Sequence, residues 1–362
     1  MASLLEILET QEAPPTEIVD NCLLCNSSKS KFLFWNFDRL NHLPGKFGVV
    51  QCEDCDLVRL SPRPVKDHLP FYYPTEDYYS YQESKSSIKH ISKRGTLSRF
   101  REAIRQVVFY ELGYRDRPLS LWQRILKPFL ARFFFKAGTY GLGKKFPTYK
   151  KDGLALDVGC GNGSYLSYLK HHGWQVIGVE LNKQAATIAK ESLDIDVYVG
   201  ELEDLAVPAN SFDYVHMSHV LEHVTSPVET LKRVRELLKP HGVVYIEVPN
   251  YDSLRRKISG KYWYAWETPK HLHMFSPSTL KRLFRACDLT ITDIETSVVD
   301  LFAWDNTYKY EELAGRKSTI RPFTTRGDKL KLFFLPKVVK LVHLFKPESG
   351  DFVHCWVRKE AE

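Results

Sequence analysis

The feature that most constrains the fold is an alternation of short apolar segments and amphipathic segments that begins at Gly153. The apolar segments predict strands at 154–159, 174–180, 194–200, 212–218, 242–249, 289–298 and 351–359. Helical patterns at 164–173, 182–193 and 226–239 lie between them. Strands that alternate with helices predict a parallel sheet covered on both faces. We therefore expect an α/β fold with a doubly wound, mostly parallel seven-stranded Rossmann-like sheet.

A glycine-rich turn follows the first of these strands. The stretch "LDVGCGNGSYL" places Gly159, Gly161 and Gly163 where the strand becomes a helix. Glycines allow positive φ and close approach of a ligand, and the helix N-terminus favours an anionic group. The second strand ends in Glu180, about 20 residues on, where an acid can bind both ribose hydroxyls of a nucleoside cofactor. A dinucleotide motif would need glycine where Ser164 stands.

This version of the turn resembles motif I of the class I S-adenosylmethionine (SAM)-dependent methyltransferases, in particular the methyltransferase-23-like group. The resemblance continues through "GVELN", "GELEDL", "SFDYVHMSHVLEHV" and "PKHLHMFSPSTLKRLF", and covers roughly residues 150 to 300. It implies SAM as the cofactor. The residues that it assigns to SAM run from the methionine end through the ribose to the adenine edge: Asp157, Gly159, Gly161, Gly163, Ser218, Glu180, Leu181, Glu201 and Leu202.

The stretch "HVLEHV" places His219, Glu222 and His223 at i, i+3 and i+4, so on a helix they would share one face. H-x-x-E-H also occurs in zinc peptidases, but here it follows a strand of a cofactor-binding sheet. Three interpretations remain. The Glu-His pair caps a helix, or a histidine acts as a base, or the three side chains bind a second divalent metal. The last follows from similarity to ubiquinone-type O-methyltransferases, whose Glu-x-x-Glu-His binds metal; His219 replaces the first Glu.

Two cysteine pairs, "CLLC" and "CEDC", form a C-x2-C…C-x2-C array. Cys22, Cys25, Cys52 and Cys55 predict a structural Zn–S4 site in a small ribbon. The alternatives are a redox pair or an iron–sulfur site, and the latter uses other spacings. The module resembles the N-terminal zinc module of bacterial sugar and natural-product methyltransferases. In that resemblance Tyr72, Tyr73, Tyr78 and Tyr79 either line the acceptor pocket or serve only in packing.

An aromatic segment, "KYWYAWETPKHLHMFSP", follows the fifth strand. Tyr262, Trp263 and Trp266 are candidates for an acceptor pocket that excludes water. His271 occupies the family's P-x-H-L position and is the preferred base for a hydroxyl proton, with tying the loop to the sheet as the alternative. His273 is expected in a structural or substrate-side role.

The pattern divides the chain into a flexible tail (1–20), a zinc-ribbon module (21–82), a basic helical linker or lid (83–150) and a methyltransferase domain (151–362). The last carries a basic helical insertion at about 302–348. From Lys85 to Lys151 there are 17 Lys and Arg against 3 acids, and from Arg316 to Lys346 there are 9 against 1. These segments either pack as a lid or contact an anionic partner such as lipid or a phosphorylated or lipid-linked acceptor. No nucleic acid is expected, because no RNA-binding module is found.

The expected function is transfer of the SAM methyl group to a hydroxyl of a small molecule: a sugar, a glycolipid or a phenolic natural product. Alternatives are C- or N-methylation of a nucleotide-sugar, and a non-catalytic SAM-binding regulator or scaffold. No apolar run reaches the roughly 20 residues that span a bilayer, and the N-terminus lacks a secretory signal pattern. We therefore expect a cytoplasmic monomer or homodimer, with peripheral contact at the inner membrane face as an alternative.

Overall fold

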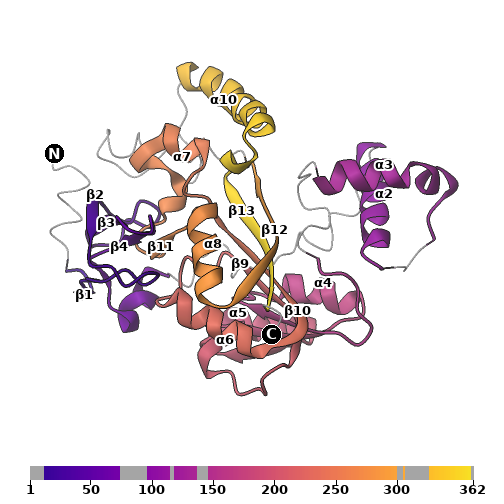
Figure 1. Cartoon of the computed structure of the whole chain (residues 1–362), viewed down its shortest axis with the longest axis horizontal. Coiled ribbons are helices and arrows are strands. Elements are labelled where there is room, and N and C mark those ends of the chain that lie inside the picture. Colours follow the sequence, from indigo (N-terminus) through magenta and orange to yellow (C-terminus); the bar gives the residue numbers. More distant parts are fainter. Residues whose placement is uncertain are drawn as a thin grey trace.

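A computed structural model describes residues 12–73, 96–114, 118–136, 146–299, 305 and 326–359. Within these ranges the chain forms a seven-stranded sheet, a four-stranded sheet and a two-stranded pair. Figure 1 shows the small N-terminal sheet at one end of the molecule and the paired helices α2 and α3 at the other.

The large sheet has the order β12-β13-β10-β9-β6-β7-β8. Its strands are β6 (Leu154–Val158), β7 (Gln175–Glu180), β8 (Asp196–Val199), β9 (Phe212–Ser218), β10 (Leu238–Pro249), β12 (Leu289–Ser297) and β13 (Phe352–Lys359). The five strands from β8 to β10 run parallel, whereas β13 is antiparallel to both of its neighbours. The predicted doubly wound, mostly parallel sheet is confirmed, and all seven expected strands belong to it.

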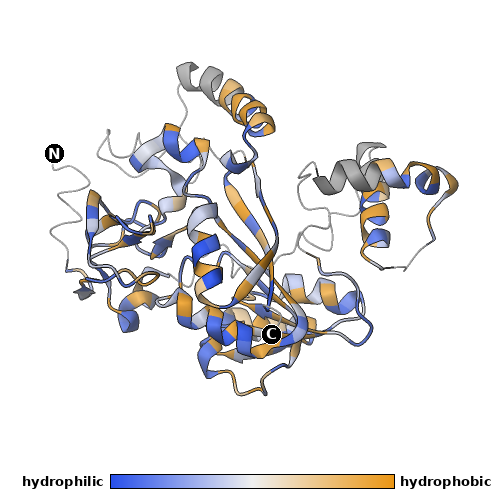
Figure 2. Ribbon diagram, viewed as in Figure 1, coloured by the Kyte–Doolittle hydropathy of each residue, from blue (hydrophilic) through white to orange (hydrophobic). Residues whose placement is uncertain are grey.

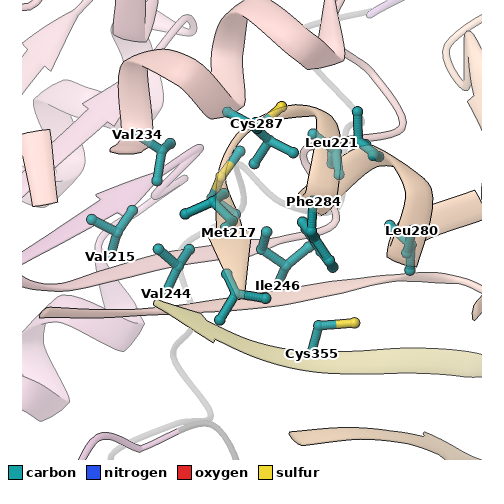
Figure 3. Close-up of a cluster of buried hydrophobic side chains, with 14 of the residues drawn as sticks. Val215, Met217, Leu221, Val234, Val244, Ile246, Leu280, Phe284, Cys287 and Cys355 are labelled. Carbon is teal, nitrogen blue, oxygen red and sulfur yellow. The ribbon is translucent and has the colours of Figure 1, made fainter. Parts of the chain in front are cut away.

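Helices cover both faces of this sheet: α4 (Ser164–His171), α5 (Lys183–Leu193), α6 (Pro227–Leu237) and α8 (Pro277–Ala286). One face carries Met217 and Ile246, which pack with Leu280 and Phe284 of α8, as Figure 3 shows. On the other face Tyr214 packs in a cluster with side chains of α4. This division follows from the alternation of side chains along each strand, since β10 is apolar on both faces.

The N-terminal module is built from β2 (Ser30–Asn36), β3 (Phe47–Cys52), β4 (Val58–Leu60) and the 3-10 helix η1 (Lys66–Tyr72). Its fourth strand is β11 (His273–Met274), which comes from the methyltransferase region and pairs antiparallel with β4. Strand β1 (Thr16–Glu17) pairs with β5 (Arg63–Pro64). Pairing with β11 connects the module to the methyltransferase region. Residues 16–17 pair with β5 of the module, so they belong to it rather than to the flexible tail that the sequence suggested.

A shared apolar core joins the module to the large domain. Phe47, Val58 and Leu60 of the module pack with Trp263 and Trp266, which lie in the segment of η5 (Gly260–Tyr262) and η6 (Tyr264–Trp266). The two indoles are almost fully buried there. Burial of a large aromatic side chain contributes roughly 1.5–3 kcal/mol by area, so the two parts stabilise each other.

The remaining helices lie around this frame: α2 (Thr96–Glu111), α3 (Leu121–Lys136), η4 (Leu202–Asp204), α7 (Leu254–Ser259), α10 (Arg326–Phe345) and η7 (Pro347–Ser349). Phe109 of α2 and the following Tyr114 pack in one cluster with Leu169 and Trp174. Part of the basic linker thus packs on the sheet domain. Among the described helices, none is both long enough and apolar enough to cross a bilayer.

Candidate active site

The glycine turn between β6 and α4 has the backbone that a close ligand requires. Gly159 and Gly163 have φ of 69° and 75°. A Cβ on Gly159 would lie 2.7 Å from Val220 Cγ2, and one on Gly163 would lie 2.8 Å from Ala189 Cβ. Only glycine fits at these two positions without displacing neighbouring side chains or straining the backbone. The sequence expectation of a tight strand-to-helix turn agrees with this geometry.

Glu180 closes the turn from the neighbouring strand. Its Oε2 accepts a hydrogen bond from the N–H of Gly161, and its Oε1 accepts one from the N–H of Asn182, both at 2.8 Å. Burial raises the pKa of this carboxyl, although the two backbone donors oppose the shift. Each carboxylate oxygen retains capacity for another donor. The neighbouring Leu181 is largely exposed, so an apolar side chain borders the carboxylate.

Asp157 and His216 form a buried pair at the carboxyl ends of β6 and β9. His216 Nδ1 lies 2.6 Å from Asp157 Oδ1, and the imidazole stacks on Tyr165 with 3.9 Å between ring centroids. His216 Nε2 is buried and has no hydrogen-bond partner among the described residues. A buried, unsatisfied nitrogen is unfavourable, and its position beside Asp157 fits a polar ligand group at the expected methionine end.

The expected adenine end of the site meets the N-terminal module. Leu202 is buried beneath the loop, whereas Glu201 is partly exposed and pairs with Lys66 Nζ of η1 at 2.7 Å. This hydrogen bond raises the pKa of Lys66. No sequence motif marks Lys66, because its partner is 135 residues away.

The stretch 219–224 is a bend and a turn rather than a helix, so the expected common face does not exist. His219 has φ of 58°, and its Nδ1 lies 3.2 Å from Glu222 Oε1. His223 instead faces Tyr73 and His271. The expected metal ligand set of His219, Glu222 and His223 is therefore not the group that the fold assembles.

The group that the fold does assemble is Glu222, His223 and His271. Their ligand atoms all lie within 4.8 Å of one another. His223 Nδ1 is 3.1 Å from the carbonyl of Lys270, and His271 Nδ1 is 2.8 Å from the carbonyl of Ala265. Because a carbonyl only accepts, the His271 bond requires the proton on Nδ1 and leaves the lone pair on Nε2, whereas Nδ1 of His223 also lies 2.9 Å from Tyr73 Oη, which can donate to it.

Burial keeps the two imidazoles of this cluster neutral. Burial, followed by the neighbouring His271, lowers the pKa of His223 to about 4, and burial also lowers the pKa of His271. Glu267 lies 3.5 Å from His271 Nε2 and forms a 3.0 Å ion pair with the buried Lys270. Burial opposes ionisation of Glu267, but His271 and Lys270 outweigh it and lower that pKa to about 2. Each imidazole is thus a neutral acceptor at neutral pH.

A second polar group, which the sequence did not single out, lies at the carboxyl end of β10. The buried carboxylate of Glu247 accepts from Ser218 Oγ at 3.0 Å and from Tyr245 Oη at 3.3 Å. Tyr245 Oη also lies 2.7 Å from His354 Nδ1, and His219 Nε2 is 3.7 Å from Glu247. The signal was an acid in an otherwise apolar strand, but its partners outside β10 come from two other parts of the chain, 218–219 and β13.

Most of the residues expected to line an acceptor pocket lie elsewhere. Tyr72, Trp263 and Trp266 belong to the core that joins the module to the domain, so their rings pack against protein. His273 is buried in β11, and Tyr262 is partly exposed beside the guanidinium of Arg39. Tyr78 and Tyr79 lie outside the described residues. From the tyrosine-rich segment it is Tyr73 that reaches the site, with its hydroxyl 2.9 Å from His223 Nδ1.

The four predicted cysteine ligands come together. Cys22 Sγ lies 3.4 Å from Cys55 Sγ, and Cys25 Sγ lies 3.5 Å from Cys52 Sγ. The four sulfur atoms fall within one group that could hold a metal. Burial opposes ionisation of Cys52, but the backbone N–H groups of Cys55 and Asp54 outweigh it and lower the pKa to about 7. Four thiols without a disulfide partner suit tetrahedral zinc.

Part of this chain is similar in sequence to known proteins. An enzyme from Xanthomonas campestris pv. campestris, named ubiquinone biosynthesis O-methyltransferase, is 30% identical over 151 residues, which are 38% of this chain and 63% of the relative. A protein of the same name from Cereibacter sphaeroides is 32% identical over 160 residues, 41% of this chain and 65% of the relative. The chain therefore spans less than two thirds of the length of these relatives.

Among solved structures, a SAM-dependent methyltransferase from Archaeoglobus fulgidus is 20% identical, with a TM-score of 0.39 over 69% of this chain and 98% of its own. The fold assignment rests on the strand order of the large sheet rather than on this likeness. Residues 123–294 match a family model described as "Methyltransferase domain", a range that includes the glycine turn, Glu180 and the histidine cluster. This part of the chain is therefore similar to that methyltransferase family.

Proposed function

We propose that the protein transfers the methyl group of SAM to a hydroxyl of a small-molecule acceptor. The observation that carries the proposal is the pairing of two features at the carboxyl edge of one sheet. One is the glycine turn closed by Glu180. The other is a pair of neutral imidazoles, those of His223 after β9 and His271 before β11. In parallel sheets this edge is where ligands bind.

SAM, when bound, supplies a methyl group on a positively charged sulfur. Glu180 would hold the ribose hydroxyls, and the backbone at Gly159 and Gly161 would accommodate the methionine end. Asp157, held by His216, would offer a carboxylate to the amino group. The orphaned Nε2 of His216 supports this assignment.

On the acceptor side, the chain would position a hydroxyl and accept its proton. His271 is the proposed base, because the carbonyl of Ala265 fixes its proton on Nδ1 and leaves Nε2 to act as acceptor. Glu267, near that nitrogen, would stabilise the imidazolium formed when the proton arrives. Tyr73 and His223 would orient the acceptor on the side of the N-terminal module. Glu222 and His271 are buried, which favours a defined geometry.

Transfer to oxygen is preferred over transfer to carbon or nitrogen, because the curated relatives are named O-methyltransferases. A phenol is the first acceptor class to test, and sugars and glycolipids follow. The decisive assay measures S-adenosylhomocysteine by mass spectrometry, with phenols and with their methyl ethers, which lack a free hydroxyl. Product only with the free phenols supports the proposal. Folded protein that takes up no SAM in calorimetry would refute it, and uptake without turnover would favour a SAM-binding regulator.

A divalent metal at Glu222, His223 and His271 is the second candidate use of the cluster. Glu222 Oε2 is buried without a hydrogen-bond partner among the described residues, and His271 donates its Nδ1 proton to a carbonyl, as metal ligands often do. Two imidazoles and one carboxylate favour Zn, Fe or Ni over Mg. Metal analysis of the wild type beside a Glu222→Gln variant, together with turnover after chelation, separates this use from the metal-free base: a second metal per chain that the variant lacks supports it.

A further inference from the structure

Helix α10 exposes an apolar stripe along its outer surface. Phe334, Val338, Leu341 and Phe345 stand at i, i+4, i+7 and i+11, so they follow one line along the helix. Each of these four side chains is at least half exposed, and Phe345 reaches 80%. Large apolar side chains in a continuous exposed row are uncommon on a protein that nothing covers. In Figure 2 the coloured part of the α10 ribbon lies at the periphery of the molecule and is largely orange, the colour of hydrophobic residues.

Helix α10 packs on the rest of the protein through a different face from the stripe. Val339 is fully buried and packs with Val298, and Leu335 and Leu254 complete this small cluster. The helix therefore has one apolar face for its own domain and a second one that points outward. Burial of Leu341 or Phe345 is not needed to anchor the helix.

Cations accompany the outer stripe. Lys337, Lys340 and Lys346 are exposed on the same helix or directly after it, and the helix contains a single acid, Asp328. The whole segment from Arg316 to Lys346 has 9 basic residues against 1 acid. An apolar row flanked by lysines places hydrocarbon at the depth of acyl chains and charge at the level of anionic headgroups.

The same composition argues against a protein partner. Cores of protein–protein interfaces are depleted in lysine, because its ammonium loses water on burial without gaining a fixed partner. At a membrane surface the lysine stem lies along the apolar region while the ammonium remains hydrated. Helix α3 repeats the pattern, with Leu121, Ile125 and Phe129 exposed at i, i+4 and i+8.

We propose that the outer stripe of α10 docks on a membrane surface that contains anionic lipid. The helix lies along the surface, with its four apolar side chains in the headgroup–acyl boundary and its lysines at the phosphates. The proposal does not depend on the proposed methyl transfer, since it uses none of the residues of the candidate active site.

Co-sedimentation of the full-length protein with vesicles tests the proposal. We expect binding to vesicles of phosphatidylcholine mixed with phosphatidylglycerol, and at least about tenfold weaker binding to phosphatidylcholine alone, because about 1 kcal/mol per lysine is lost. The double variant Leu341→Glu/Phe345→Glu should weaken binding to the anionic vesicles at least about tenfold, since each side chain contributes more than 1 kcal/mol when buried.

The matched control is Ile18→Glu, which changes an equally exposed apolar residue on the N-terminal module and should leave vesicle binding unchanged. Light scattering and thermal unfolding of the double variant check that the fold persists. Absence of wild-type binding at low salt would overturn the proposal. So would equal loss of binding in the Ile18→Glu control, or a dimer that the double variant dissociates without any wild-type vesicle binding.

Discussion

Replacement of Glu180 by glutamine tests whether this carboxylate binds the cofactor. The carboxylate now accepts from two backbone donors, the N–H of Gly161 and the N–H of Asn182. Glutamine has nearly the same shape but only one acceptor oxygen, so its NH2 group must face one of these donors or the ribose. The change therefore removes the charge and one acceptor without opening a cavity.

The structure gives the expected size of the effect. A hydrogen bond to a charged group contributes about 1.5–3 kcal/mol, and loss of one such bond to the ribose raises the Kd for SAM by about 10- to 150-fold. One buried backbone donor left without a partner costs about 1–3 kcal/mol, so thermal stability of the free protein should fall modestly. Exposed Glu191 of α5 provides the control, and Glu191→Gln should change neither quantity.

Calorimetry with SAM over a range of pH adds a second measurement. Burial raises the pKa of Glu180 above the 4.5 of an ordinary glutamate. Lowering the pH therefore protonates this group earlier, and SAM affinity should begin to fall at a higher pH than an ordinary glutamate would give. Glu180→Gln should lack this dependence. Tight SAM binding by Glu180→Gln, with the pH profile of the wild type, would show that Glu180 serves the turn and not the cofactor.

Three further outcomes follow from the packing and the site. Cys25→Ser should release zinc and should also speed amide hydrogen exchange at Leu60, whose N–H donates to the carbonyl of Leu272; retained protection there would show that this pairing does not depend on the cysteine site. Trp263→Ala should lower the free energy of unfolding in urea by about 3–5 kcal/mol. The control Trp122→Ala, on exposed α3, should change it by less than about 0.5 kcal/mol. Equal effects of the two substitutions would contradict the shared core. His271→Gln should reduce turnover by about 10²- to 10⁴-fold while the Kd for SAM stays constant, and a proportional loss of SAM affinity would assign this histidine to the fold instead.

Local sequence determined the parts of the protein whose contacts are close in the chain. The strands of the large sheet follow from runs of apolar residues, and the glycine turn follows from three glycines at fixed spacing. The cysteine pairs stand out because a C-x2-C…C-x2-C array is typical of a zinc site. In each case the residues that define the strand, the turn or the cysteine pair lie close together in the sequence.

The assembly of the acceptor side was decided by tertiary structure. Tyr73, His223 and His271 meet although about 200 residues separate the first from the last, because β11 crosses from the large domain to complete the module's sheet. That same crossing buries Trp263 and Trp266, which in the sequence look like the wall of a pocket. Aromatic composition alone does not distinguish a ring that faces a ligand from one that faces protein.

The backbone at "HVLEHV" also differs from the helix that the spacing of its residues predicts. Periodicity predicts a shared face only if the backbone is helical, and His219 adopts a positive φ directly after β9. The chain turns there because Leu221 is buried in the main core and the backbone of Glu222 bonds the segment that leads into β11. Sequence thus determined which elements form and which cofactor they suit, whereas long-range packing decided which histidines share a site, since contacts between distant segments have no local pattern.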